Sequence, residues 1–538
     1  MSQALPLDDP AAVTVVPAAS CAGELPLEPL IEPAIDPSVV PYAVPSDSLA
    51  QSVLALVALT AVQPVLAFVR GMVFCRWLEP AQLGEWDLVL GFVTLAAPVA
   101  VLGVPGSFGR YVERYRMRGQ LRTFLTSTSV FSFVLAVLAV GLLIGGGPWF
   151  SRLIFSTPDR LNTMALVAVC LAAVIAFGFA NELLIALRRF RVASGLQLVR
   201  SVAFLLVGLA LLELWQLTAT SVIAAYSVAC LLTALLASLW LATAWREVPP
   251  GRGQPLTQRE LWPQLMPFAL WIWAAAALAN LFEVVDRYMI VHFSRLPTIE
   301  ALTQVGHYHS SRVLPLLFVA FASTLAAMIL PHLSRDWESG RREAVVARLN
   351  LFLKFFGFAF TLGGAVVLLA APLLFGVALE GKYDGGLAVL PWTLTYCIWF
   401  ALLFLVEDYL WCAEKARLGS LALLAGLLAN VGLNLVLLPR LGLLGAVLAT
   451  TASKLLALAL VCFFSRRLGL RFERATLLAC ALPLCLIAGA GAALAVLAAV
   501  AVAAVATEWC LSREQRRELL DIAAGFTARL PGWRRQPS

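Results

Sequence analysis

Long apolar runs separated by short polar connections occupy most of this sequence. Six runs fall at roughly 50–75, 87–108, 123–144, 162–187, 196–214 and 218–244, and six more at roughly 264–293, 306–333, 349–378, 386–412, 416–438 and 442–465. A helix that crosses a bilayer needs about 20 consecutive, mainly apolar residues, and these runs reach or approach that length. The pattern predicts an all-α polytopic membrane protein.

The last apolar block, at roughly 475–507, is too long for one ordinary span. Because Gly489 and Gly491 interrupt it, we expect a pair of short helices, which gives 12 to 14 transmembrane helices in total.

A polar segment, REVPPGRGQPLTQRE, separates the two sets of runs. Residues 1–49 contain nine of the 29 prolines and seven acidic residues but no lysine or arginine, a composition typical of disorder. The predicted domains are a disordered cytoplasmic tail (1–49), an N-lobe of six helices (50–245), a cytoplasmic linker (246–263), a C-lobe of six helices (264–465), a C-terminal transmembrane hairpin (466–510) and a basic cytoplasmic tail (511–538).

Composition excludes a water-soluble enzyme. The chain is 61% hydrophobic and 13% charged, whereas soluble domains are about 25% charged. The formal net charge of +7 does not indicate a nucleic-acid partner, because basic residues gather in alternate loops. Those loops, which include Arg110–Arg122 and Arg188–Arg200, hold 23 of the 39 basic residues, and the intervening loops hold six. By the positive-inside rule the basic loops and the N-terminus are predicted to be cytoplasmic.

An internal repeat relates the two lobes. The segment RGMVFCRWLEPAQLGEW, from Arg70, resembles RYMIVHFSRLPTIEALTQVGHY, from Arg287. Three pairs of equivalent residues differ by 222 to 225 positions: Gln82 and Gln304, Arg110 and Arg335, and Gly195 and Gly419. Six predicted spans separate the copies, so the repeats run parallel, and a polar site is expected between the lobes.

Several segments carry a family resemblance. They are FCRWLEPAQLGEW (74–86), VDRYMIVHFS (285–294), QVGHYHSS (304–311), ILPHLSR (329–335), GKYDGGLAVLPW (381–392) and ANVGLNLVLLPRLGLLGAVLATTAS (429–453). Over about residues 50–465 the chain resembles the polysaccharide flippases, of the Wzx or O-antigen export type, of the multidrug/oligosaccharidyl-lipid/polysaccharide (MOP) superfamily. The resemblance implies a bacterial cytoplasmic-membrane protein that moves undecaprenyl-diphosphate-linked oligosaccharide by alternating access, for cell-surface polysaccharide biosynthesis.

A diphosphate substrate would require fixed cations in the cavity. Ionisable residues within spans usually mark a site or a pathway, and the candidates are Arg70, Arg287, Arg312 and Lys454. Arg70 and Arg287 occupy equivalent repeat positions and are expected to face each other as a diphosphate clamp. The alternatives are interfacial snorkelling or, for Arg287, an i,i+4 pair with Glu283. Lys454 lies mid-span, so a carboxylate or a bound anion is expected beside it.

Carboxylates within the spans are candidates for coupling to a proton or sodium gradient: Glu283, Asp286, Glu407, Asp408 and Glu182. The alternative for the last three is pairing with neighbouring basic loops, at Arg188 or Lys415.

Two other functions remain open. A multidrug cation antiporter of the same superfamily would need an anionic cavity, and a membrane glycan polymerase or ligase would need a larger outer loop than 145–161 or 293–305. No nucleophile–base pair, ATP motif, cofactor or metal site is expected, and the His307-x-His309 pair lacks further ligands. The expected partners are lipid-linked oligosaccharide, membrane lipids and polysaccharide polymerase or chain-length proteins, with no nucleic acid, for a protein that is monomeric.

Overall fold

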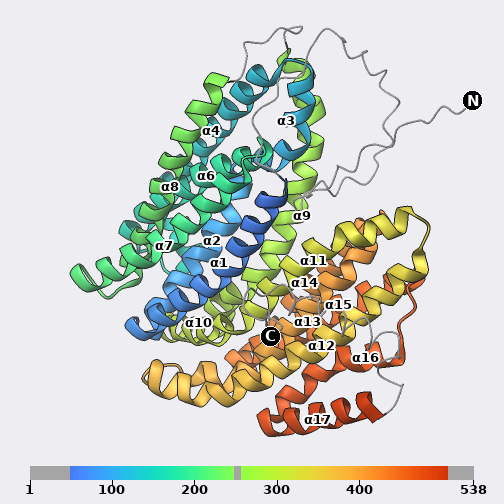
Figure 1. The fold of residues 1–538 in the computed structure, drawn as a ribbon. Helices are drawn as coiled ribbons and strands as arrows, with labels where there is room; N and C mark the ends of the chain where they lie inside the picture. The colour runs from blue at the N-terminus through green and yellow to red at the C-terminus, as the bar shows by residue number, and fades with distance from the viewer. Residues whose placement is uncertain (1–48, 248–255, 507–538) are drawn as a thin grey trace, which may run out of the picture.

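The computed structural model describes residues 49–247 and 256–506, and within them all regular structure is helical. The N-lobe contains α1 (Leu49–Trp77), α2 (Pro80–Ala100), η1 (Val104–Ser107), α3 (Phe108–Met117), α4 (Leu121–Gly145), α5 (Gly147–Phe155), α6 (Leu161–Ala186), α7 (Phe190–Leu214) and α8 (Ala219–Glu247). The C-lobe contains α9 (Gln258–Phe293), α10 (Thr298–Val313), α11 (Pro315–Glu338), α12 (Arg342–Leu373), η2 (Leu374–Ala378), α13 (Asp384–Cys412), α14 (Ala416–Leu441) and α15 (Leu443–Arg467). The two lobes lie side by side (Figure 1), which confirms the predicted all-α architecture.

Eleven of the described helices are long and apolar enough to cross a membrane. The chain is therefore a multi-pass membrane protein. The last apolar block forms α16 (Arg474–Ala481), η3 (Leu482–Ala488) and α17 (Ala490–Ala506), which lie against α12. The predicted break is confirmed at Gly489, whose φ of +96° suits glycine. Gly491, in contrast, lies inside α17, so the break predicted there is wrong.

Several predicted boundaries move because helices continue past their apolar stretches. The second helix begins at Pro80 rather than near residue 87, and α9 begins at Gln258, inside the predicted linker. Arg200, expected in a loop, lies in the interior of α7. The predicted tails at 1–48 and 507–538 and the linker segment at 248–255 lie outside the described residues.

The arginine-rich connections, such as those joining α3 to α4 and α11 to α12, lie on one face of the molecule, here called the basic face. The connections between α1 and α2 and between α9 and α10 lie on the opposite face. In Figure 1, α3 is near the top, and α10 lies at the lower end of the N-lobe, above α17.

The lobes meet most extensively where α2 packs on α10, towards the opposite face. A Cβ atom added to Gly84 would overlap the Leu302 carbonyl oxygen, and one added to Gly306 would overlap the Pro80 carbonyl oxygen. Both glycines are therefore required for this close approach. The contact is symmetric, since 306 − 84 and 302 − 80 both give the repeat offset of 222, and this symmetry supports the predicted internal repeat.

Helix α9 links the lobes at the basic face. Its first turns bury Leu261 and Leu265 in an N-lobe cluster with Phe108. The Tyr111 hydroxyl of α3 also donates a hydrogen bond to the Gln264 carbonyl at 2.8 Å. Farther along, α9 packs against α14 of the C-lobe. This helix therefore carries its later residues, from Glu283 to Arg287, into the region between the lobes.

Candidate substrate-binding cavity

A cavity of about 560 Å³ lies between the lobes. Helices α1, α2, α7 and α8 contribute its N-lobe wall, and α9, α10 and α11 contribute its C-lobe wall. Three of the four predicted cations, Arg70, Arg287 and Arg312, line it together with Arg200. The fold thus brings together residues that are up to 242 positions apart in the sequence (312 − 70).

Arg70 and Arg200 line the N-lobe wall against aromatic rings. The Arg70 guanidinium carbon lies 4.7 Å from the centre of the Phe204 ring, and Arg200 Nη1 lies 3.5 Å from the Tyr226 hydroxyl. The Phe204 and Tyr226 rings are in contact, with centroids 4.9 Å apart. The sequence did not single out Arg200 as a site residue, because Arg200 lies near a run of arginines whose pattern is typical of a loop.

Asp87 connects the lobes and was not predicted as a site residue. It projects from α2, is 1% exposed, and its Oδ2 atom lies 3.0 Å from Arg287 Nε. Its Oδ1 atom lies 2.7 Å from Nδ1 of His309, on α10. Asp87 and His309 differ by the repeat offset of 222 (309 − 87), so they face each other near the symmetry axis. The repeat alignment, extended by one residue past Trp86, could have identified this pair.

Glu283 holds the other two predicted cations. Its carboxylate oxygens lie 2.9 Å from Arg312 Nη2 and 2.5 Å from Lys454 Nζ. The carboxylate expected beside Lys454 is thereby confirmed, and the alternative i,i+4 pair between Glu283 and Arg287 does not form among the described contacts. Lys454 is 2% exposed, and its ammonium group also lies over the Phe400 ring, so Lys454 belongs to the C-lobe interior and not to the cavity surface.

Asp286 is buried among neutral donors. The side-chain amides of Asn430 and Asn434 donate to its Oδ1 atom at 2.9 and 3.0 Å, and the hydroxyls of Thr450 and Tyr308 donate to its Oδ2 atom at 2.7 and 3.1 Å. The described residues place no basic group in ion-pairing contact with this carboxylate. Four hydrogen bonds therefore replace the counter-ion that a buried charge usually needs.

The remaining predicted carboxylates lie away from the cavity. Glu407 packs against Gly419 of α14, where an added Cβ would overlap Glu407 Oε1. One oxygen of buried Asp408 has no hydrogen-bond partner within the described part of the chain. The alternative pairing of Glu182 with Arg188 does not occur, because Arg188 lies beside Glu113. The structure thus gathers Glu283 and Asp286 near the site and leaves these three carboxylates outside it.

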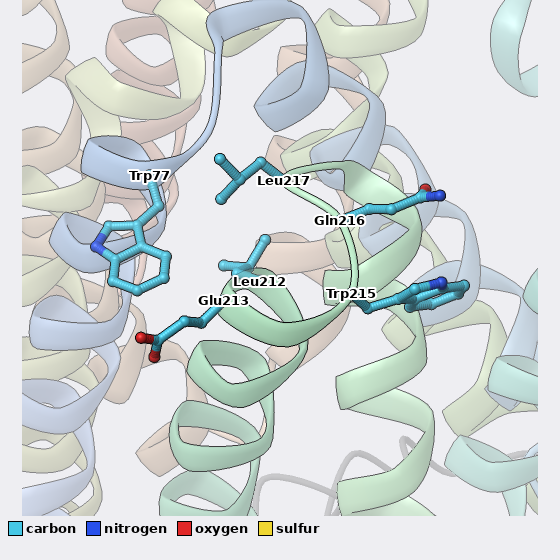
Figure 2. Close-up of a pocket in the computed structure, with 6 residues that line it drawn as sticks. All are labelled: Trp77, Leu212, Glu213, Trp215, Gln216 and Leu217. Carbon is cyan, nitrogen blue, oxygen red and sulfur yellow. The ribbon is translucent and has the colours of Figure 1, made fainter.

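A second cavity, of about 420 Å³, opens at the opposite face beside the ends of α1 and α7. Figure 2 shows the six residues that line it, among them Trp77, Glu213 and Trp215. Trp215 is 54% exposed, as is usual for tryptophans at a membrane interface. The lining of this small cavity includes none of the predicted site residues.

Two helical lobes that are related by an internal repeat, with a polar cavity between them, define a fold class of membrane transporters. The family model described as "Polysaccharide biosynthesis protein" matches residues 49–337, more than half of the chain. The chain therefore belongs to the polysaccharide biosynthesis protein family. A comparison with curated proteins gave no match.

Solved structures share the fold at low sequence identity. The lipid II flippase MurJ, in an inward closed conformation, is 12% identical with a TM-score of 0.62, over 81% of this chain and 92% of that chain. An inward-facing multidrug resistance MATE family transporter of the MOP superfamily is 13% identical with a TM-score of 0.55, over 77% and 97%. A MOP superfamily transporter from Pyrococcus furiosus Vc1 is 13% identical with a TM-score of 0.56, over 79% and 98%. These similarities establish the MOP transporter fold.

Proposed function

We propose that this protein is a flippase that moves a lipid-linked oligosaccharide, carried on undecaprenyl diphosphate, across the cytoplasmic membrane. The observation that carries the proposal is the charge of the site between the lobes. Four cations (Arg70, Arg200, Arg287 and Arg312) line the cavity together with one carboxylate, Asp87. The formal excess of three positive charges complements a diphosphate, which carries at least two negative charges.

The contacts between the lobes support a cycle of alternating access. They are concentrated towards the opposite face, where α2 meets α10 and Asp87 joins Arg287 and His309. In this proposal the basic face is cytoplasmic, and substrate enters from that side. Release on the other side then requires the contact between α2 and α10 to separate.

Asp286 is the carboxylate best placed to couple transport to an ion gradient. It is held by neutral donors, and the buried Oδ1 atom of neighbouring Asn434 has no hydrogen-bond partner among the described residues. A proton or a sodium ion bound at Asp286 would neutralise the carboxylate, and a sodium ion would also use the free amide oxygen as a ligand. Glu283 is less suitable, because Arg312 and Lys454 already neutralise it.

Binding to the full-length protein in lipid nanodiscs tests the proposal. We expect undecaprenyl diphosphate to bind more tightly than undecaprenol, and its binding to weaken at raised salt because part of the attraction is between charges. Equal affinity for the two lipids, together with displacement by organic cations, would contradict the flippase proposal and favour a cation antiporter.

A further inference from the structure

The cations of the site are compensated differently in the two lobes. In the C-lobe, Arg287 lies 3.0 Å from Asp87 Oδ2, and Arg312 shares Glu283 with Lys454. These three residues are at most 8% exposed. A carboxylate already bound to a cation competes with an incoming anion, so each of these groups attracts substrate less strongly than an unpaired cation would.

Within the described ranges, Arg70 and Arg200 have no such partner. Neither guanidinium lies within 4.0 Å of a carboxylate oxygen of a described residue, and both side chains are only half-buried on the cavity wall. They rest on adjoining rings, Arg70 on Phe204 and Arg200 beside Tyr226, so both lie on the same part of the cavity wall. Two like charges held together in a low-dielectric cavity are stabilised when a dianion lies between them.

Polar side chains continue from this pair towards the basic face. On α1, Gln63 lies seven residues before Arg70, a rise of about 10 Å along the helix. Gln63 donates to the side-chain oxygen of Gln197 at 3.0 Å, and Gln197 donates to that of Asn181 at 3.1 Å. Amides both donate and accept hydrogen bonds, which matches the hydroxyl groups of a sugar.

We propose, on the basis of the function proposed above, that Arg70 and Arg200 together form the diphosphate-binding site, on the N-lobe wall alone. Arg200 on α7 takes the place in the clamp that the repeat assigned to Arg287. Gln63, which lines the cavity and is held in place by Gln197 and Asn181, then faces the first sugar of the substrate. While this site is loaded, Arg287 holds the lobes together through Asp87, and Arg312 stays paired with Glu283 inside the C-lobe.

The test compares undecaprenyl diphosphate with undecaprenyl monophosphate, bound to the full chain in nanodiscs at low and raised salt. A charge-assisted hydrogen bond contributes about 1.5–3 kcal/mol, so Arg200→Gln is expected to weaken diphosphate binding about 10- to 100-fold. It should also reduce the preference for diphosphate over monophosphate and flatten the salt dependence. Arg200→Lys keeps the charge without the planar fork, so an intermediate loss is expected.

The matched control is Arg440→Gln, which removes an exposed arginine at the end of α14 and should leave all three readouts unchanged. If the wild-type protein prefers the diphosphate and Arg200→Gln keeps its affinity, preference and salt dependence, the assignment of Arg200 is overturned while the flippase proposal stands. If the wild-type protein itself shows no preference for the diphosphate, the proposed function fails. Should Arg200→Gln not fold, unchanged binding in Arg200→Lys would overturn the assignment.

Discussion

At the residue scale, the three carboxylates of the site differ in what surrounds them. Asp87 and Glu283 each contact two basic side chains, whereas Asp286 receives four hydrogen bonds from neutral groups. An ion-paired carboxylate has little tendency to take up another cation, because its charge is already balanced. These surroundings, and not the residue type, single out Asp286 for coupling.

Asp286→Asn is expected to remove the dependence of transport on the driving ion. The amide cannot bind a proton or a cation as a carboxylate does. An interaction with a charged group is worth about 1.5–3 kcal/mol, so its loss should reduce the stimulation of transport by the ion gradient about 10-fold or more. The measurement is the rate at which labelled lipid is flipped in proteoliposomes, with and without imposed proton and sodium gradients. Glu182→Gln is the comparison, since Glu182 lies outside the cavity. If transport by Asp286→Asn still responds to the gradient and transport by Glu182→Gln does not, Asp286 is not the coupling residue.

At the scale of elements, helices α2 and α10 are positioned by two glycines. Gly84 and Gly306 allow each backbone to approach a carbonyl oxygen of the other helix, Leu302 and Pro80 respectively. Both are backbone carbonyls, which cannot move aside as a flexible side chain can. A methyl group at either glycine can therefore be accommodated only by separating the helices.

Gly84→Ala is therefore expected to destabilise the protein by about 1–3 kcal/mol, the usual effect of overpacking. The matched control is Gly178→Ala in α6, where an added Cβ meets nothing within 4 Å; there the substitution should stabilise the helix by about 0.5–1 kcal/mol. Thermal unfolding in detergent measures both. A melting temperature for Gly84→Ala as high as that of Gly178→Ala would show that α2 and α10 do not pack this closely.

At the scale of the whole molecule, further contacts join the lobes at the opposite face. Lys382, between η2 and α13, forms an ion pair with Glu79 at 3.2 Å, and the Tyr383 hydroxyl donates to the Leu78 carbonyl at 2.9 Å. Exposed ion pairs contribute only about 0.2–1 kcal/mol each, so these contacts can separate during a transport cycle.

Linking the lobes at this face should stop transport. In a variant without the native cysteines, the substitutions Glu79→Cys and Lys382→Cys introduce two thiols, one on each lobe. A short, reducible thiol-reactive cross-linker would then join them. Flipping in proteoliposomes should fall to background after cross-linking and recover on reduction, and each single cysteine variant serves as the control. Full transport by the cross-linked protein would rule out opening between the lobes at this face.

Three features can be predicted from the amino-acid sequence alone: the helical membrane fold, the two lobes and the presence of charged residues within the spans. These follow from local properties: the length of apolar runs, the distribution of arginines and a repeat offset that is read directly from the chain. Even the break at Gly489 is a local property of the backbone. For the same reason, the sequence is enough to identify Arg70, Arg287, Arg312 and Lys454 as candidates, because each is a cation within an apolar run.

The pairing of the charged side chains, in contrast, depends on how the helices pack. The nearest carboxylate along the chain to Arg287 is Asp286, yet its partner is Asp87, and the partner of Lys454 is Glu283. Helix packing brings these residues together from 171 to 200 positions apart (454 − 283 and 287 − 87). Electrostatic interactions act across space and are strongest where water is excluded. The pairing that leaves Arg70 and Arg200 without a carboxylate among the described residues therefore depends on the packed lobes, which no local pattern specifies.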